Sequence, residues 1–241
     1  YQFIVRASDS LTGNPVAEKT FTLNVADLNE NPSLTLDGST LDRTQGFLEQ
    51  DGSDVSGNEK SFGNGALISD VDDSNEISSL NISFANNLGS EHQILIAGND
   101  DIIALDDAGG TSGEVTVNTV VYDYVLNQTA GQPTVVNFTP KSTASVSTTE
   151  MQNLVNALQY NNTSDNPSGS VTFGVTVTDS SGLSDGSEIS SVADFQVNLT
   201  SVNDTPTLTF TNTATNAAFT ENQGSHQTAN KVVINNTFSA G

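Results

Sequence analysis

The sequence contains no cysteine and no tryptophan, and only 6 of its 241 residues are lysine or arginine. Without cysteine, the chain can form neither a disulfide nor a thiolate metal site. Its 29 aspartates and glutamates give a formal net charge of −23 at pH 7, which repels nucleic-acid phosphates and anionic membrane surfaces. It also has no run of about 18 apolar residues, the length that spans a bilayer. We therefore expect no nucleic-acid binding and no membrane insertion of this segment.

Sequence features of a catalytic site are also scarce. His92 and His226 belong to no spaced metal motif, and there is no Gly-x-Ser-x-Gly sequence. The acidic pairs Asp100-Asp101 and Asp106-Asp107 would suit a two-carboxylate glycosidase, but no tryptophan is present to stack on a sugar ring. Solvated turns explain these pairs better, and a further cation site is the alternative. Because no nucleophile and base can be paired, we predict that the protein is not an enzyme.

Apolar residues alternate with polar ones in several short runs bounded by Gly, Asn, Asp and Ser, which predicts half-buried antiparallel strands. The alternating apolar positions are Tyr1, Phe3, Val5 and Ala7; Phe21, Leu23 and Val25; Leu34 and Leu36; Leu80, Ile82 and Phe84; Val171, Phe173, Val175 and Val177; and Phe195, Val197 and Leu199.

One segment instead has helical spacing. Met151, Leu154, Val155 and Leu158 recur at the intervals of one helix face, and Ser147 with Glu150 has the spacing of a capping box. This pattern predicts a short helix over about 150–159 that packs its apolar stripe against a sheet.

Three blocks recur in the same order. Phe3-Ile-Val-Arg-Ala-Ser-Asp9 matches Phe173-Gly-Val-Thr-Val-Thr-Asp179, an offset of 179 − 9 = 170. The segment 21–32 matches 195–206 with an offset of 174, and Phe47-Leu48-Glu49 matches Phe219-Thr220-Glu221 with an offset of 172. The repeat predicts that the chain contains pieces of three similar units.

The repeat sets the expected domain boundaries. Residues 1–31 are the C-terminal strands of one unit, 32–205 are a complete unit, and 206–241 are the N-terminal strands of a following unit. Since Tyr1 lies within an alternating run, we expect the chain to be a piece of a longer protein. A lone hairpin is marginal in water, so either neighbouring sequence completes the outer pieces or 1–31 and 206–241 pair as a split domain.

Two acidic segments have the composition of a calcium site, which needs about six to eight oxygen ligands. The segment Asp27-Leu28-Asn29-Glu30-Asn31-Pro32 alternates acids and amides, and its proline stiffens the exit. In Asp70-Val71-Asp72-Asp73, extended backbone points Asp70 and Asp72 the same way. Asp179 ends a strand and is a candidate to close the same site. Such carboxylates repel one another unless a cation lies between them; solvated turns are the alternative.

These blocks resemble cadherin-type repeats. That family has Asp-x-Asn-Asp-Asn-x-Pro in its inter-domain linker, Asp-x-Asp after its second strand and an Asp closing its sixth strand. Residues 27–32 resemble the linker, with Glu30 for its second Asp and the proline one position early. The second linker, 201–206, is a weaker match because Ser201 replaces an Asp. Its Val-Asn-Asp-x-Pro ending is more similar to the cadherin-like repeats of large bacterial adhesins related to RTX (repeats-in-toxin) proteins.

The resemblance implies an all-β fold: an enlarged cadherin-like or immunoglobulin-like antiparallel sandwich with one short helix, flanked by partial repeats. It also implies Ca2+ as the bound ion. At the first junction the implied ligands are Asn29, Glu30, Asn31, Asp70, Asp72 and Asp179, with Asp27 and Asp73 as less certain members. At the opposite end of the middle unit they are Glu49, Asn203 and Asp204. The second site is expected to be incomplete, because the third unit stops before its own Asp-x-Asp.

The function that follows is a calcium-rigidified segment of an extracellular, cell-surface adhesin. Its partners are neighbouring repeats of the same chain, and it would act as a stiff spacer that projects a distal ligand-binding region. The alternative is that the middle unit is itself a recognition module for a cell-surface glycan or a protein or peptide ligand. That alternative rests on the segment 85–145, which the resemblance covers poorly and a plain spacer does not need; we expect its extra length in loops.

Overall fold

The computed structural model describes residues 1–8, 16–26, 28–49, 58–71, 76–85, 88–98, 101–106, 111–129, 132–180 and 188–203. These form mainly antiparallel β-sheets with a single helix, which confirms the strands expected from the alternation and the all-β sandwich that the resemblance implied. The helix is not long and apolar enough to span a membrane. The elements are β1 (Gln2–Ser8), β2 (Val16–Thr22), β3 (Ser33–Thr35), β4 (Arg43–Leu48), β5 (Lys60–Ser61), β6 (Leu67–Ser69), β7 (Glu76–Phe84), β8 (His92–Ile96), β9 (Ile102–Ala104), β10 (Ser112–Val117), β11 (Val120–Asn127), β12 (Thr134–Pro140), β13 (Val146–Ser147), α1 (Thr148–Ala157), β14 (Leu158–Asn162), β15 (Gly169–Asp179) and β16 (Ala193–Thr200).

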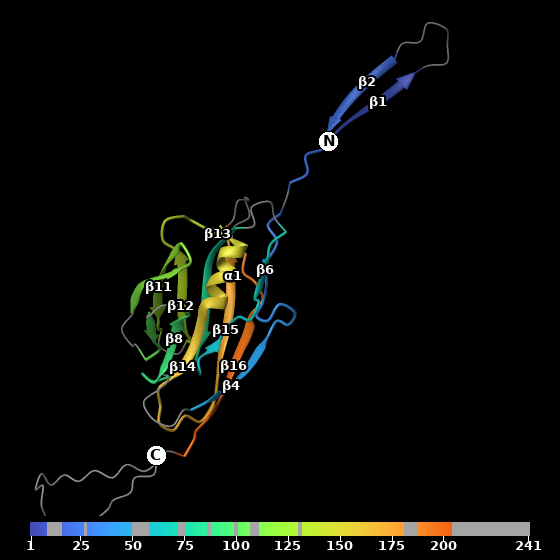
Figure 1. The fold of residues 1–241 in the computed structure, drawn as a ribbon. Helices are drawn as coiled ribbons and strands as arrows, with labels where there is room; N and C mark the ends of the chain where they lie inside the picture. The colour runs from blue at the N-terminus through green and yellow to red at the C-terminus, as the bar shows by residue number, and fades with distance from the viewer. Residues whose placement is uncertain are drawn as a thin grey trace, which may run out of the picture.

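Two main sheets pack around one core (Figure 1). The larger has eight strands, in the order β10-β11-β12-β7-β15-β16-β4 with β13 also pairing with β7. The smaller has the order β5-β14-β8-β9. Aromatic rings join the two: Phe62 lies 4.5 Å from Phe195 and 5.1 Å from Phe173, and Tyr160 lies 5.5 Å from Phe173, between ring centroids. The apolar residues that alternate along β7, β15 and β16 form the side of the core on the larger sheet. Their period of two predicted that these side chains share one buried face.

The helix α1 begins at Thr148, two residues before the predicted 150, because Ser147 is its N-cap, and its apolar stripe packs as predicted. The hydroxyl Oγ of Ser147 accepts a hydrogen bond from the Glu150 backbone N–H at 3.2 Å, and Glu150 Oε2 accepts from the Ser147 N–H at 2.9 Å. These bonds satisfy two of the backbone donors that a helix start leaves unpaired. The apolar stripe is buried in the core. The helix ends at Ala157, short of the predicted 159, because Leu158 is extended and pairs with Ile96 in the smaller sheet.

The first part of the sandwich crosses between layers. β3 pairs with β6, whereas β4 pairs in parallel with β16, with Leu199 opposite Phe47. Asp37 stabilises the turn between β3 and β4, because its Oδ1 accepts from the Thr40 N–H at 2.6 Å. Gly38 has φ +79°, and a Cβ there would lie 2.9 Å from the Gly65 carbonyl oxygen, so this turn requires glycine.

We expected the extra length of segment 85–145 to lie in long loops, but the described part of the segment consists mainly of strands. It contributes β8 and β9 to the smaller sheet and β10, β11 and β12 to the larger one. Alternating residues of these strands, such as Ile94, Tyr122 and Phe138, are fully buried, so the extra length widens both layers of the sandwich around the same core.

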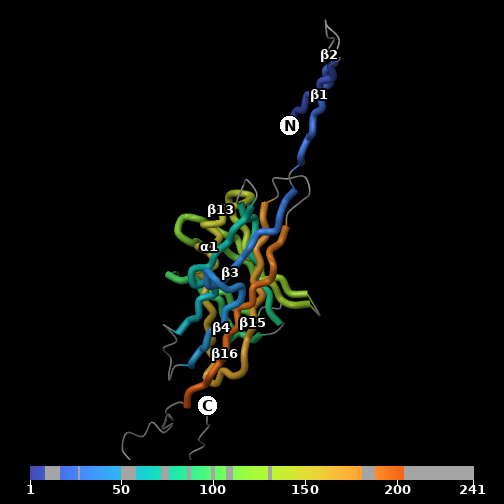
Figure 2. Tube along the Cα trace, turned by 90° about the vertical axis from the view of Figure 1, so that its right-hand side faces the viewer, coloured from blue at the N-terminus to red at the C-terminus, as the bar shows by residue number. Residues whose placement is uncertain are grey.

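The hairpin β1–β2 is a separate two-stranded sheet that extends away from one end of the sandwich (Figure 1, Figure 2). Its side chains are exposed wherever they are described, including Phe3 and Phe21. The linker from the hairpin enters the sandwich at this end, and β16 leads the chain out at the other end (Figure 2). Whether 1–31 pairs with 206–241 lies outside the described residues, as does everything beyond Asn203.

Candidate metal centre

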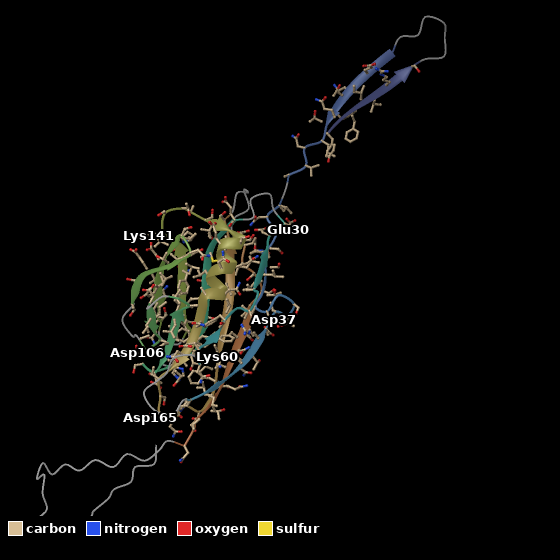
Figure 3. The ribbon with its side chains drawn as sticks, viewed as in Figure 1. Glu30, Asp37, Lys60, Asp106, Lys141 and Asp165 are labelled. Atoms are coloured by element: carbon tan, nitrogen blue, oxygen red, sulfur yellow. The ribbon has the colours of Figure 1, made fainter. Side chains whose placement is uncertain are left out.

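The end of the sandwich that receives the linker is built from three segments. The linker passes Asn29–Asn31 and becomes β3, whose Ser33 pairs with Ser69, the last residue of β6, just before Asp70. β15 ends at the same place with Asp179. Figure 3 shows Glu30 where the linker reaches the sandwich, and Asp165 at the opposite end. Residues separated by 150 positions, Asn29 and Asp179, are therefore brought to one edge of the sandwich.

Asp179 is the centre of this edge. Its side chain is only 1% exposed. Oδ2 accepts a hydrogen bond from Asn29 Nδ2 at 2.6 Å, and Oδ1 accepts from the backbone N–H of Glu188 at 2.7 Å. Both donors are neutral amides. Burial of a carboxylate is costly unless hydrogen bonds or an opposite charge compensate for it, so Asp179 is a place where added positive charge would stabilise the fold.

A β-bulge sets the position of Asp179. The register between β15 and β7 shifts between Thr178 and Asp179, so that Ile77 lies opposite Asp179. The hydroxyl of Ser78 donates to the carbonyl oxygens of both Thr178, at 3.1 Å, and Asp179, at 2.6 Å. A bulge of this kind redirects the side chain that follows it, and here it places a carboxylate at the sheet edge.

The other first-junction candidates lie close by or fall outside the described part of the chain. Asn31 donates from Nδ2 to the Ile189 carbonyl at 2.8 Å, so two linker amides bind the strand end. Asp70 is buried, and Glu30 is exposed. Asp27, Asp72 and Asp73 lie outside the described residues. Among residues that are described, no group of three or more His, Cys, Asp or Glu side chains could hold a metal ion.

This geometry identifies what a cation would change. Asn29 donates to Asp179 with its amide nitrogen, whereas a calcium ligand uses the amide oxygen. A cation at Asp179 would therefore require the Asn29 carboxamide to turn over.

The repeat comparison missed Glu76. It begins β7 directly after the acidic run 70–75, and its Oε2 accepts from the hydroxyls of Ser145 at 2.6 Å and Ser180 at 3.3 Å. Its backbone carbonyl accepts from the Ser180 N–H at 2.9 Å, one residue beyond Asp179. The signal that would have found it is its position opposite Ser180, which only the strand register reveals.

At the opposite end, Glu49 contacts the second linker. It follows β4 and is buried, and its Oε2 accepts from the Val202 N–H at 2.9 Å. Its own N–H donates to the Thr200 carbonyl at 3.0 Å, which extends the parallel pairing of β4 with β16. Asn203 follows as an exposed residue, and Asp204 lies beyond the described residues. The structure thus places Glu49 beside the linker that contains its two implied partners.

His92 is a core residue, which accords with its lack of a metal motif. The hydroxyl of Tyr160 lies 2.8 Å from His92 Nδ1, and Asn162 Nδ2 lies 3.2 Å from that hydroxyl. The hydroxyl accepts from Asn162, and the direction of its bond with His92 Nδ1 is set by the tautomer of the ring. Burial lowers the pKa of His92, with an opposing effect of Glu91, and burial raises the pKa of Tyr160 to about 12. This cluster is therefore neutral at pH 7. His226 lies outside the described residues.

Comparisons of the chain with protein-family models, with curated proteins and with solved structures found no match. The likeness to cadherin-type repeats therefore rests on the sequence motifs alone.

Proposed function

We propose that this chain is a calcium-rigidified spacer segment of an extracellular adhesin. The observation that carries the proposal is the contact between Asn29 of the linker and the buried carboxylate of Asp179 at one end of the sandwich. Glu49 repeats the arrangement at the other end, where a buried carboxylate accepts from the second linker. Each linker is thus attached to the sandwich through an acid that a cation would stabilise.

The mechanism is electrostatic. With a net charge of −23, the folded chain repels itself, and both linkers contain acids. A divalent cation held between the linker and the strand end would replace this repulsion with attraction and restrict rotation about the linker. Entry and exit lie at opposite ends of the sandwich, so stiffened linkers would extend tandem units into a rod (Figure 2).

We propose calcium as the ion, the two linkers as its binding places and the outside of a cell as the setting. Calcium suits acid and amide oxygens in a flexible site, and extracellular calcium modules bind at about 10⁻⁴–10⁻³ M. The ion would link neighbouring repeats of the same chain, and the rod would extend outward from a cell surface. The distal ligand is not part of this segment.

The test is small-angle scattering of the chain in millimolar calcium and after chelation. We expect a larger maximum dimension with calcium and a smaller, more variable one without it. Asp179→Asn should abolish the difference, and Asp194→Asn, at an exposed position near the start of β16, serves as the matched control that keeps it. Magnesium at equal ionic strength separates ligation from screening, because it demands stricter octahedral geometry. Identical scattering in calcium and in chelator would sink the proposal.

A further inference from the structure

A pocket of about 480 Å³ opens between α1 and the turns of the widened part of the sandwich. One wall is the helix, through Asn153, Asn156 and Ala157. The other wall comes from the end of β8, at Ala97 and Gly98, and from the β10–β11 turn at Val117 and Asn118. Its volume is within the range of about 300–1,000 Å³ that is usual for small-molecule sites. None of the residues that line it belongs to either linker.

The lining of this pocket is neutral. None of the described residues that line it carries a charge, although the chain as a whole has a net charge of −23. Asn118, Asn153 and Asn156 bring three carboxamides, each able to donate and to accept, and Val117, Ala97 and Ala157 bring a small apolar surface. A cation would find no carboxylate there, and an anion would find no basic group.

The carboxamide of Asn156 is fixed in orientation. Its Oδ1 accepts from the backbone N–H groups of Gly65, at 3.1 Å, and Ala66, at 3.0 Å. Two donors at one atom identify that atom as oxygen, so the two N–H donors of the same group remain for the pocket. Gly63 permits this contact, because a Cβ there would lie 2.5 Å from Asn156 Oδ1.

The opposite wall is shaped by unusual backbone. Asn118 has φ 55° at the tip of the β10–β11 hairpin, and Gly98 has φ 80° after β8. The N–H of Ala97 donates to the Ala157 carbonyl at 2.7 Å, which joins the β8 end to the end of α1. Asn153 and Asn156 are three residues apart and so share one helix face. Two of the three carboxamides are therefore held on the helix, and the third lies in the tight turn between β10 and β11.

We propose that this pocket binds a neutral, hydroxyl-rich small molecule of the monosaccharide class. Such a ligand presents hydroxyls that donate and accept, which suits the three carboxamides, and C–H faces that suit Val117, Ala97 and Ala157. It carries no charge, which suits the uncharged lining. No tryptophan is available to stack on it, so binding is in the millimolar range and would gain from many copies of the unit.

The experiment is an NMR titration of the ¹⁵N-labelled chain in a chelator, so that calcium at the junctions plays no part. The probes are glucose, galactose, methyl mannoside and N-acetylglucosamine, with glucuronate and glucosamine as charged counterparts. At least one neutral probe should give saturable shifts at the amides of Gly98, Asn118 and Asn153. Glucuronate and glucosamine should bind more weakly than the neutral sugar.

Variants locate the binding. Asn153→Ala should weaken it about 3- to 10-fold, the effect of losing one hydrogen-bonding group. Asn153→Trp, which fills the pocket, should abolish it. Asn127→Ala makes the same change at an exposed position at the end of β11 and should leave binding unaltered. Absence of saturable shifts with every neutral probe, shifts confined to other surfaces, or equal binding of glucuronate would overturn the proposal.

Discussion

The hairpin β1–β2 and the strand pair β15–β16 have matching sequences and opposite environments. In the hairpin, Phe3 pairs with Phe21, and in the sandwich their repeat counterparts Phe173 and Phe195 pair in the same register. Phe3 is 53% exposed, whereas Phe173 is fully buried. Alternation therefore specifies a strand pair and its register, but it does not supply the layer that covers the apolar face.

The covering layer in the sandwich comes from distant segments. Phe62, next to β5, and Tyr160 of β14 lie 5.1 Å and 5.5 Å from Phe173, between ring centroids. Phe84 of the neighbouring strand β7 lies 5.8 Å from Phe173 within the same sheet. Among the described residues, no aromatic ring from another segment packs on the hairpin. Its ion pair between Arg6 and Glu18, at 2.6 Å, is exposed, and exposed ion pairs add little stability. The difference between the two regions is thus one of tertiary contacts alone.

The sharpest way to break this comparison is to truncate the paired phenylalanines. Phe173→Ala should lower the free energy of unfolding by about 3–5 kcal/mol, because it leaves a cavity in a packed aromatic core. Phe3→Ala should change it by less than about 0.5 kcal/mol, as for exposed positions in general. Urea denaturation followed by far-UV circular dichroism measures both. Similar losses in the two variants would mean that the hairpin is covered in solution.

The strand-end acids extend the comparison to calcium. At about 100 times its dissociation constant, calcium should stabilise the sandwich by about 2.7 kcal/mol. Asp179→Asn should remove most of that gain, because it removes the charge at the centre of the junction. Asp9→Asn, the matching change in the repeat block of the hairpin, should leave it intact. Thermal unfolding with calcium and with chelator gives the two gains, and a gain that survives in Asp179→Asn would contradict ligation.

The linker joins the hairpin to the sandwich, and a variant of Asn29 tests how strongly the linker is attached to the sandwich. Asn29→Ala removes the 2.6 Å hydrogen bond to Asp179 and should cost about 1–2 kcal/mol without calcium, since the acceptor is a buried carboxylate. Leu28→Ala, an exposed neighbour, is the control. Chelated samples compared by urea denaturation would show the loss. If Asn29→Ala and Leu28→Ala behave alike, the linker is not anchored through this contact.

A smaller effect should appear with pH, because the sandwich contains His92 and the described hairpin has no histidine. The folded pKa of His92 lies below its unfolded value of about 6.5, so the unfolded state binds more protons between the two values. Stability is therefore complete above about pH 6.5 and falls as pH drops toward the folded pKa. Urea midpoints at pH 7.5 and pH 5.5 should differ less in His92→Gln than in the unaltered chain. An unchanged pH dependence in that variant would assign it to other groups.

Much of the fold was open to prediction from local pattern. Period-two alternation located β7, β15 and β16 with the correct faces inward, and the capping box located the start of α1. The helix end was wrong by two residues, because Leu158 continues the apolar stripe but pairs as a strand residue. The segment 85–145 was wrongly expected in loops, because short strands in two different sheets leave a weak local signal.

The candidate site divides in the same way. The resemblance implied that Asn29 and Asp179 would share one edge and that Glu49 would lie beside the second linker, and the structure has a hydrogen bond at each place. Glu76, by contrast, needed the strand register to be found beside Ser180. Calcium at these places stays a prediction.

The amino-acid order alone determined the strands, the helix start and the acids at each linker, because these depend on neighbours a few positions apart. Only the tertiary structure decided that the faces of β15 and β16 are buried and those of β1 and β2 are not, and that three asparagines border one neutral pocket. Burial and pocket shape are set by contacts between segments that are not neighbours in the sequence, and alternation contains no information about which segments those are.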